Sequence, residues 1–431
     1  MRLYMIASAI FFGFGAAALA ISADTLPGET RDETFRQLEL FGDALSIVES
    51  NYVTDPSKTD LIEQAMDGML KSLDPHSAYL SPDEFRDLNQ SISGEYGGVG
   101  IEVTVRDEFI TIISPIADTP GEAAGLESND RIIGVDGDSM VGQSSDDAVS
   151  RIRGPVGEPV TLTISRDGVD PFDVEIIREI IEVRAARWRL IDDEIPYLRL
   201  STFHNHTTEN AVEGLNDMIE ALGNDLPGLV LDLRSNPGGA LDQSVYVTDL
   251  FLDGGEVVSA RGRDPRDTQR YNAQPGDMLN GAPIVVLINS GSASASEIVT
   301  GALKDRGRAT IVGMTSFGKG SVQSVIRLDN GGGLRLTTAR YYTPAGNSIQ
   351  ATGIEPDIAI APRRLDPDAP ALRNEASLAN ALVNESGEER EALDVTQIEM
   401  PPEDWAEGED YQLHRAVEIL RSQMIGEQAS L

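Results

Sequence analysis

The sequence predicts a multidomain α/β protein. Its 431 residues suffice for several domains, and a hydrophobic share of 40% suffices to fill their cores. Apolar residues recur at helical spacing in residues 32–90, short β-rich runs fill 91–167, and strand-like runs alternate with helical patterns in 168–363. Three modules of different character therefore follow one another, and an acidic extension over 364–431 comes after them.

The charge of the chain and its missing residue types exclude several kinds of site. The formal net charge is −37, and so acidic a chain does not bind a nucleic-acid backbone through its general field. The absence of cysteine excludes disulfides, a thiolate nucleophile and zinc–sulfur sites. His204 and His206 form an H-x-H pair, but no third ligand is evident near them. We therefore expect no nucleic-acid partner, no metal and no organic cofactor.

The first residues have the pattern of an export signal. Arg2 gives a minimal positive start, an apolar run extends to Ile21, and small residues offer cleavage after Ala20 or Ala23. This predicts a signal peptide over residues 1–23. An uncleaved membrane anchor is the alternative, because the apolar run approaches the length that spans a bilayer. In either case we expect an exported protein of the periplasm or the cell envelope.

Residues 24–90 are expected to form an N-terminal helical region. LELFGDALSIVES and LIEQAMDGMLKSL have helical spacing, with a break at 52–56 between them. LDPHSAYLSPDEF follows as a turn and a new helix start.

Residues 91–167 are expected to form a compact peptide-binding module. GGVGIEVTV, FITIISPI, DRIIGVDGDSM and PVTLTISRDG are short strand patterns, whereas TPGEAAGL and SSDDAVSRIRG have the pattern of short helices.

Residues 168–363 alternate strands with helices. The helical patterns include TTENAVEGLNDMIEAL and SASEIVTGALKD. The strand-like runs are VEIIREIIEV, IPYLRLSTF, GLVLDLRS, APIVVLINS, RATIVGM and GLRLTTARYY. In the acidic, proline-spotted extension over 364–431, YQLHRAVEILRSQM predicts a helix, and packing or dimerisation is its expected role.

Residues 313–321 read GMTSFGKGS, and two hypotheses compete for the lysine. A phosphate-binding loop would fit Gly313, Gly318 and Lys319, but Gly320 replaces the required hydroxyl and the following SVQSVIRL favours a strand, not a helix. A general base is the other hypothesis. Only four of the 34 basic residues are lysines, and a buried lysine, unlike arginine, can lose its proton. A chance surface lysine stays open at this point.

A base needs a nucleophile, and a serine-rich turn stands just upstream. APIVVLI predicts a strand, and the residues after Gly291 predict a helix. A serine at such a turn has an exposed hydroxyl and a helix dipole that favours negative charge. The candidates are Ser290, Ser292, Ser294 and Ser296. Ser294 also fits a capping box with Glu297, so capping and catalysis remain equal alternatives on local sequence.

Taken together, these motifs resemble those of the carboxyl-terminal processing proteases, also called tail-specific proteases. The resemblance spans residues 35–362 and implies a crotonase/ClpP-like ββα peptidase core with an inserted PDZ domain. Its segments, all in family order, are LDPHSAYL, GGVGIEV, SPIADTPGEAAGL, NDRIIGVDG, LRLSTF, LDLRSNPGGAL, GSASASEIVTGALKD and TSFGKGSVQ.

The resemblance assigns the catalytic roles. It implies a serine–lysine dyad in which Ser294 is the nucleophile and Lys319 the general base, with Gln323 supporting the lysine amine. On a strand, Lys319 and Gln323 would share one face, because four is an even number of residues. The backbone N–H of Ala295 and of a turn glycine, either Gly238 or Gly239, would form the oxyanion hole.

The resemblance also assigns a peptide-binding site. In a PDZ domain an extended C-terminal peptide adds as a strand, and a glycine loop surrounds its carboxylate. Arg153 would couple peptide binding to the active site. The loop residues here are Gly97, Gly98, Val99, Gly100 and Ile101.

The implied function is that of a serine endopeptidase acting on exported proteins recognised by their unstructured C-termini. The implied partners are these substrates, an activator or adaptor protein, and a second copy of the chain in a homodimer. The alternative is a catalytically silent or gated PDZ adaptor of the cell envelope.

Overall fold

The computed structural model describes residues 28–223, 225–365, 373–390, 396–406 and 408–428. The expected signal segment over 1–23 lies outside these residues. The chain divides into two units, with the boundary between Ala65 and Met66. Within the described part, no helix combines the length and the apolar character needed to cross a bilayer.

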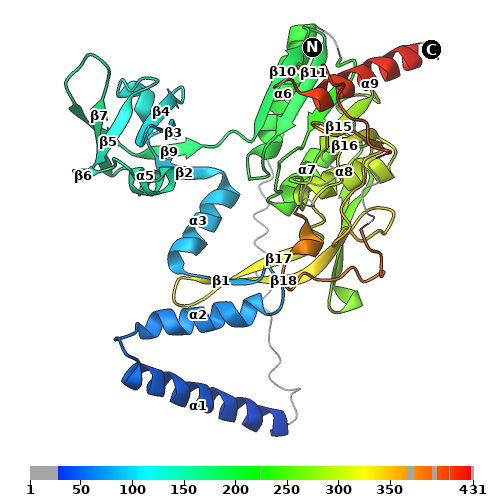
Figure 1. Ribbon diagram of the computed structural model, residues 1–431. Coiled ribbons are helices and arrows are strands. Elements are labelled where there is room, and N and C mark those ends of the chain that lie inside the picture. Colours follow the sequence, from blue (N-terminus) through cyan, green and yellow to red (C-terminus); the bar gives the residue numbers. More distant parts are fainter. Residues whose placement is uncertain (1–27, 224, 366–372, 391–395, 407, 429–431) are drawn as a thin grey trace, which may run out of the picture. The chain divides into compact units, whose positions relative to one another are not determined.

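The described part of the first unit, from residue 28 on, is helical, as the sequence predicts (Figure 1). Helix α1 covers Gly28–Asn51, and helix α2 (Lys58–Lys71) begins in this unit after the expected break. Several large apolar side chains of α1 are exposed, among them Phe35 and Leu38, each 60% accessible. This helix therefore presents an apolar surface of its own.

The second unit opens with the LDPHSAYL segment. It forms the short strand β1 (Ala78–Leu80), and helix α3 (Pro82–Ser93) follows. A capping box between Ser81 and Glu84 starts α3, and Gly94 in the left-handed conformation ends it.

A small β module follows, with two short helices. Its sheet has the order β3-β4-β5-β7-β8, with β6 added beside β5. Apolar side chains such as Ile110, Ile132 and Leu162 are fully buried in its core. The elements are β3 (Ile101–Arg106), β4 (Phe109–Pro115), α4 (Pro120–Ala123), β5 (Arg131–Val135), β6 (Asp138–Ser139), α5 (Ser145–Ile152), β7 (Pro159–Ser165) and β8 (Phe172–Ile177).

The module is inserted between paired strands. Strand β2 (Glu95–Gly98) enters it, strand β9 (Glu179–Glu182) leaves it, and the two pair antiparallel. Strand β8 pairs with β7 along its whole length, so the sheet continues to Ile177, beyond residue 167 where the sequence pattern places its end.

The larger domain is built on a six-stranded sheet in the order β10-β11-β12-β15-β16-β19. All neighbours are parallel except β10, an antiparallel edge strand. Its elements are β10 (Ala186–Ile191), β11 (Ile195–Leu200), α6 (Thr207–Leu222), β12 (Leu229–Asp232), α7 (Leu241–Asp249), β15 (Ile284–Ile288), α8 (Ala295–Asp305), β16 (Ala309–Gly313), β19 (Ile358–Ala359) and α9 (Tyr411–Gln428).

Helices cover both faces of this sheet (Figure 1). Leu229 and Leu231 pack with α6, α7 and α8, whereas Val230 between them packs with α9. Burial on both faces explains the continuous apolar runs that the sequence shows at β12 and β15. The predicted helix in the C-terminal extension thus has the packing role expected of it.

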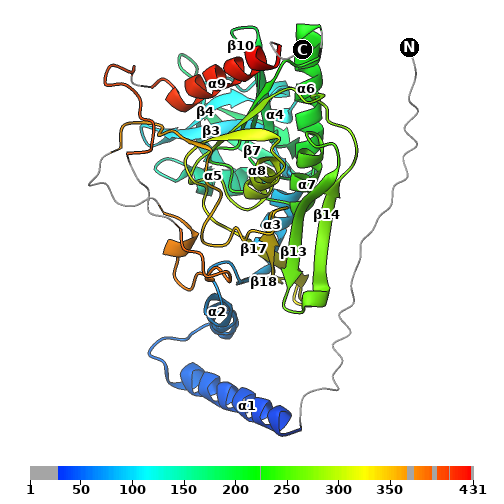
Figure 2. The same cartoon turned by 90° about the vertical axis from the view of Figure 1, so that its right-hand side faces the viewer.

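A second sheet carries the lysine turn. Its order is β1-β18-β13-β14, with β17 on the free side of β18. Figure 2 shows β13 and β14 as a long ribbon beside α7. The strands are β13 (Gly255–Gly262), β14 (Thr268–Ala273), β17 (Ser321–Arg327) and β18 (Gly333–Tyr342); the 3-10 turns η1 (Pro265–Asp267) and η2 (Glu375–Ser377) lie in connections.

Candidate active site

Ser294 lies at the turn between β15 and α8. It is the N-cap residue of α8, with φ 54° and ψ −110°. A non-glycine residue at positive φ is strained and persists only where its surroundings hold it, as they often do at functional turns. Ser294 and Glu297 stand in the positions of a capping box, but the N–H of Glu297 donates to the carbonyl oxygen of Ser294 at 2.8 Å, which leaves the hydroxyl without a firm capping bond.

Two neighbouring serines have structural roles instead. The hydroxyl of Ser292 donates to Leu233 O at 2.8 Å, and that of Ser296 donates to Asn236 O at 2.9 Å. Both serines are fully buried. These bonds distinguish Ser294 from two of its three competitors, a separation that the alternating sequence could not provide.

The buried carboxylate of Glu297 joins the serine turn to the lysine turn. It accepts hydrogen bonds from the N–H of Ser294 at 2.7 Å, of Gly318 at 2.7 Å and of Lys319 at 2.9 Å. The hydroxyl of Ser316 donates to it at 2.5 Å. Burial raises the pKa of Glu297 to about 7, although these four hydrogen bonds oppose the shift. The sequence predicts Glu297 only as a capping residue, because its contacts at 316–319 are tertiary.

Lys319 is partly buried just before β17. Burial lowers the pKa of its amine below the usual value, and the positive charge of Arg335 acts in the same direction, while nearby carboxylates oppose both. A lysine with a depressed pKa holds more of the neutral amine, which is the form that can accept a proton. The environment therefore suits a general base.

Gln323 lies on β17, where the strand pairing is irregular. The strand begins only at Ser321, and its register against β18 shifts between Val322 and Gln323. Regular alternation of side chains along one strand therefore does not place Lys319 and Gln323 on a shared face. The side-chain nitrogen of Gln323 donates to Ser321 Oγ at 2.9 Å and to Thr337 Oγ1 at 3.4 Å.

The partner of Thr337 fixes which way this amide faces. Thr337 Oγ1 donates to Asp74 Oδ1 at 3.0 Å, because an ionised carboxylate can only accept. The threonine oxygen is then the acceptor for the amide nitrogen of Gln323. The carbonyl oxygen of Gln323 is left for a different donor, which is what support of a neutral lysine amine requires. That support stays a prediction.

The glycine turn predicted for the oxyanion hole lies against the start of α8. Gly238 and Gly239 have φ of 102° and 142°, and a Cβ on Gly238 would stand 2.9 Å from Ala295 N. The N–H of Gly238 donates to Asn236 Oδ1 at 2.9 Å. Within the described chain, the N–H groups of Gly239 and Ala295 have no acceptor. They are the better pair of candidate oxyanion donors.

The predicted peptide-binding residues surround a small pocket of about 60 Å³. Gly98, Val99, Gly100 and Ile101 form one side of it, and Arg153 at the end of α5 forms the other. Gly97 is not among the lining residues; it packs against Gly154, whose carbonyl oxygen would lie 2.1 Å from a Cβ at position 97.

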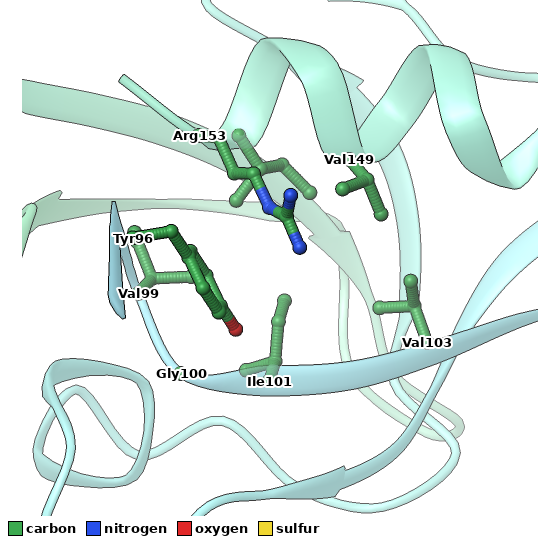
Figure 3. Close-up of a pocket in the computed structure, with 9 residues that line it drawn as sticks. Tyr96, Val99, Gly100, Ile101, Val103, Val149 and Arg153 are labelled. Atoms are coloured by element: carbon green, nitrogen blue, oxygen red, sulfur yellow. The ribbon is translucent and has the colours of Figure 1, made fainter. Parts of the chain in front are cut away.

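Figure 3 shows a residue of this pocket that the sequence argument missed. The guanidinium of Arg153 lies over the ring of Tyr96, 4.1 Å from its centroid. Val149 from α5 and Val103 from β3 complete an apolar wall. Tyr96 directly precedes the glycine loop, and this position is the only feature of the sequence that could have indicated a role for it in the pocket.

The histidine pair has other partners. His204 is buried, and His206 lies 3.0 Å from the carboxylate of Glu95. In the described part of the chain, no group of three or more His, Asp or Glu side chains is placed to hold a metal ion.

Three protein-family models match successive parts of the chain. Residues 194–360 match peptidase family S41, residues 89–165 match the PDZ domain, and residues 15–84 match the N-terminal domain of the activating protease CtpB. The carboxy-terminal-processing protease of Bartonella bacilliformis is 49% identical over 361 residues, which cover 83% of each chain.

The chain belongs to the carboxy-terminal processing proteases of peptidase family S41. A probable CtpA-like serine protease of Staphylococcus haemolyticus is 35% identical and aligns with 80% of this processing protease and 69% of its own length. The solved photosystem II D1 C-terminal processing protease is 30% identical and covers 76% of the chain, with a TM-score of 0.42. This processing protease is thus a serine-type peptidase with a PDZ domain, and the predicted fold class is confirmed.

Proposed function

We propose that this protease uses Ser294 and Lys319 as a catalytic dyad on exported proteins whose unstructured C-termini bind in the PDZ pocket. The observation that carries the proposal is the Glu297 carboxylate. It accepts hydrogen bonds from the backbone of both dyad residues, so it ties the nucleophile turn to the turn of the base.

The chemistry follows from the groups at the site. The neutral amine of Lys319 takes the hydroxyl proton as Ser294 Oγ attacks the peptide carbonyl, and it then protonates the leaving amine. The N–H groups of Ala295 and Gly239 stabilise the oxyanion of the tetrahedral intermediate. Water completes the cycle by hydrolysing the acyl-enzyme. No metal or organic cofactor takes part.

Substitution of each dyad residue tests the assignment. Ser294→Ala and Lys319→Arg should each lower cleavage of an unfolded substrate with an apolar C-terminus by at least about 10³-fold, because arginine keeps the charge but cannot release its proton. Ser290→Ala and Lys304→Arg are matched controls that should keep activity. Cleavage that survives in both dyad variants would eliminate the dyad.

An inert wild-type protein would instead favour the alternative of a gated PDZ adaptor, or a missing activator. Circular dichroism of Lys319→Arg shows whether loss of activity is loss of fold. If that variant does not fold, Lys319→Ala supplied with a small primary amine gives a second test, since partial rescue requires a missing base.

Recognition of the substrate C-terminus is a separate prediction. Arg153 and the glycine loop line the same PDZ pocket, which supports the proposal that they bind the substrate carboxylate there. Amidation of the substrate C-terminus should therefore raise KM roughly tenfold or more, with a smaller change in kcat. Equal cleavage of amidated and free substrates would refute the carboxylate site.

Partners and location belong to the same proposal. Export is supported by the residue pattern at 1–23. A homodimer is supported by the exposed apolar side chains of α1. An activator or adaptor protein is the remaining partner in this proposal.

A further inference from the structure

An arginine-lined groove lies on the edge of the peptidase sheet, outside the dyad and the PDZ pocket. Its volume is about 600 Å³, and its lining includes Arg184, Arg187, Arg189, Arg199, Tyr197 and Ser201. All four arginines are exposed. The chain has 71 acidic residues for 34 basic ones, yet in the described part of the chain none of these arginines has a carboxylate within ion-pair distance.

The pairing of β10 with β11 brings these charges together. Arg187 stands directly opposite Arg199, and Arg189 stands opposite Tyr197, so all four side chains lie on one face of the sheet. Like charges directly opposite each other destabilise a strand pair. Arg189 lies over the Tyr197 ring, at 5.4 Å from the centroid, and the charge of Arg199 helps to lower the pKa of the Asp410 carboxyl. Among the described residues, Arg187 has no such relief. An anionic occupant would supply it.

The edge of β10 indicates the form of the occupant. Among the residues that the structure describes, β10 pairs with β11 alone, so its outer edge presents free backbone N–H and C=O groups to an added strand. In such a strand every second side chain would lie on the arginine face. The complementary ligand is therefore an extended peptide with acidic residues at alternate positions.

One end of the groove, at Ser201, is two residues along the chain from the segment that contacts the glycine turn. Two residues after Ser201, the N–H of Phe203 donates to Gly238 O at 3.0 Å, and Phe203 O accepts from Ala240 N at 2.7 Å. At the opposite end of the β10–β11 pair, residues 192–194 form an acidic turn in which Asp192 is paired with Arg421 at 2.7 Å. Along the strand pair, the arginines therefore lie between this turn and the segment that contacts the glycine turn.

We propose that this groove is an exosite that binds an acidic, extended segment of the polypeptide being cleaved. The inference rests on the proposed peptidase function and adds a preference for acidic substrates. The arginines act by holding substrate beside the site, so their contribution falls on KM and kcat/KM and leaves kcat for short neutral peptides unchanged.

Two substrates with the same C-terminus and cleavage region test the proposal, one extended by repeats of Glu-Thr and the other by Gln-Thr. Wild type should cut the acidic substrate with a kcat/KM on the order of fivefold higher, and 0.5 M salt should remove most of the difference. Arg187→Glu should remove most of the preference, because its carboxylate offsets part of the charge of the three remaining arginines, whereas Arg363→Glu, an exposed arginine after β19, should keep it. Equal rates for both substrates with wild type, or equal loss in both variants, would overturn the exosite.

Binding to a Ser294→Ala protein separates this proposal from the peptidase assignment. Fluorescence anisotropy of a labelled Glu-Thr repeat should show binding that Arg187→Gln weakens, even if wild type cleaves nothing. Because Arg187→Gln also removes the like-charge pair, its melting temperature should equal or exceed that of wild type. A lower melting temperature would mean that the arginine stabilises the strand pair, and would contradict the inference.

Discussion

At the scale of single residues, the sequence indicated the catalytic side chains more clearly than the contacts that hold them in place. A lysine in an arginine-rich chain and a serine at a strand-to-helix turn pointed to Lys319 and Ser294. The left-handed backbone of Ser294 and the four contacts of Glu297 depend on tertiary packing, and no local pattern encodes them.

The titration of Glu297 should change activity and stability in opposite directions as pH rises. Its carboxylate form accepts four hydrogen bonds, so activity should rise as pH increases through about 7. Its pKa is raised in the folded state, so the stability it contributes is fully present below the unfolded pKa of about 4.3 and is lost as pH rises through about 7. Profiles of kcat and of unfolding free energy against pH test both signs.

Glu297→Gln separates this titration from that of Lys319. The variant offers one acceptor where four donors converge, so kcat should fall on the order of 100-fold through misplacement of the dyad. The step near pH 7 should vanish from both profiles, while the dependence on Lys319 deprotonation remains. A variant whose pH profiles match those of wild type would show that Glu297 does not control the site.

At the scale of elements, periodicity predicted most of the strands and helices, but α7, β13 and β14 were not predicted. It also failed where pairing is short or distant. β1 has three residues, too few for a periodic signal, and its partner β18 lies more than 250 positions away. Likewise, nothing in VEIIREIIEV indicates that its first half pairs with β7 of the PDZ domain and its second half with β2.

The β1 segment brings Asp74 to the catalytic sheet, and this gives an element-scale prediction. The buried carboxylate accepts from the N–H of His76, from Ser77 and from Thr337. Burial alone would raise the pKa of Asp74, but these hydrogen bonds outweigh it and hold the pKa below its usual value. Its stabilisation is therefore present above the unfolded pKa of about 3.9 and lost as pH falls through the folded value.

Asp74→Asn should cost about 2 kcal/mol of unfolding free energy near pH 7, because an amide faces donors that only the carboxylate can satisfy. It should also lower kcat roughly tenfold, since Thr337 would no longer fix the amide of Gln323. Urea unfolding and steady-state kinetics measure the two effects. Asp87→Asn, on the exposed face of α3, is the control. If Asp74→Asn loses stability without loss of kcat, the link to Gln323 is wrong.

At the scale of the whole molecule, the part of the first unit whose side chains the structure describes, residues 32–65, contains no buried residue and hence no core. Phe35, Leu38, Phe41 and Val48 recur at helical spacing on α1 and are all more than 40% exposed. Full burial of one such side chain contributes about 1.5–3 kcal/mol, so a stripe of four is enough to drive association. A second copy of the chain is the simplest partner for this apolar stripe, because the stripes of both copies are then buried in one contact.

The prediction is a dimer that the α1 stripe holds together. Phe35→Glu combined with Phe41→Glu should shift the protein from dimer to monomer in light scattering coupled to size exclusion, because burying two carboxylates in an apolar contact costs several kcal/mol. Arg36→Glu changes the charge on the opposite side of the same helix and should leave the dimer intact. A double variant that remains dimeric would place the interface elsewhere, and a wild-type monomer would leave the stripe to a different partner. Processing of an acidic substrate by the monomer would then show whether the exosite and the dyad act within a single copy of the chain.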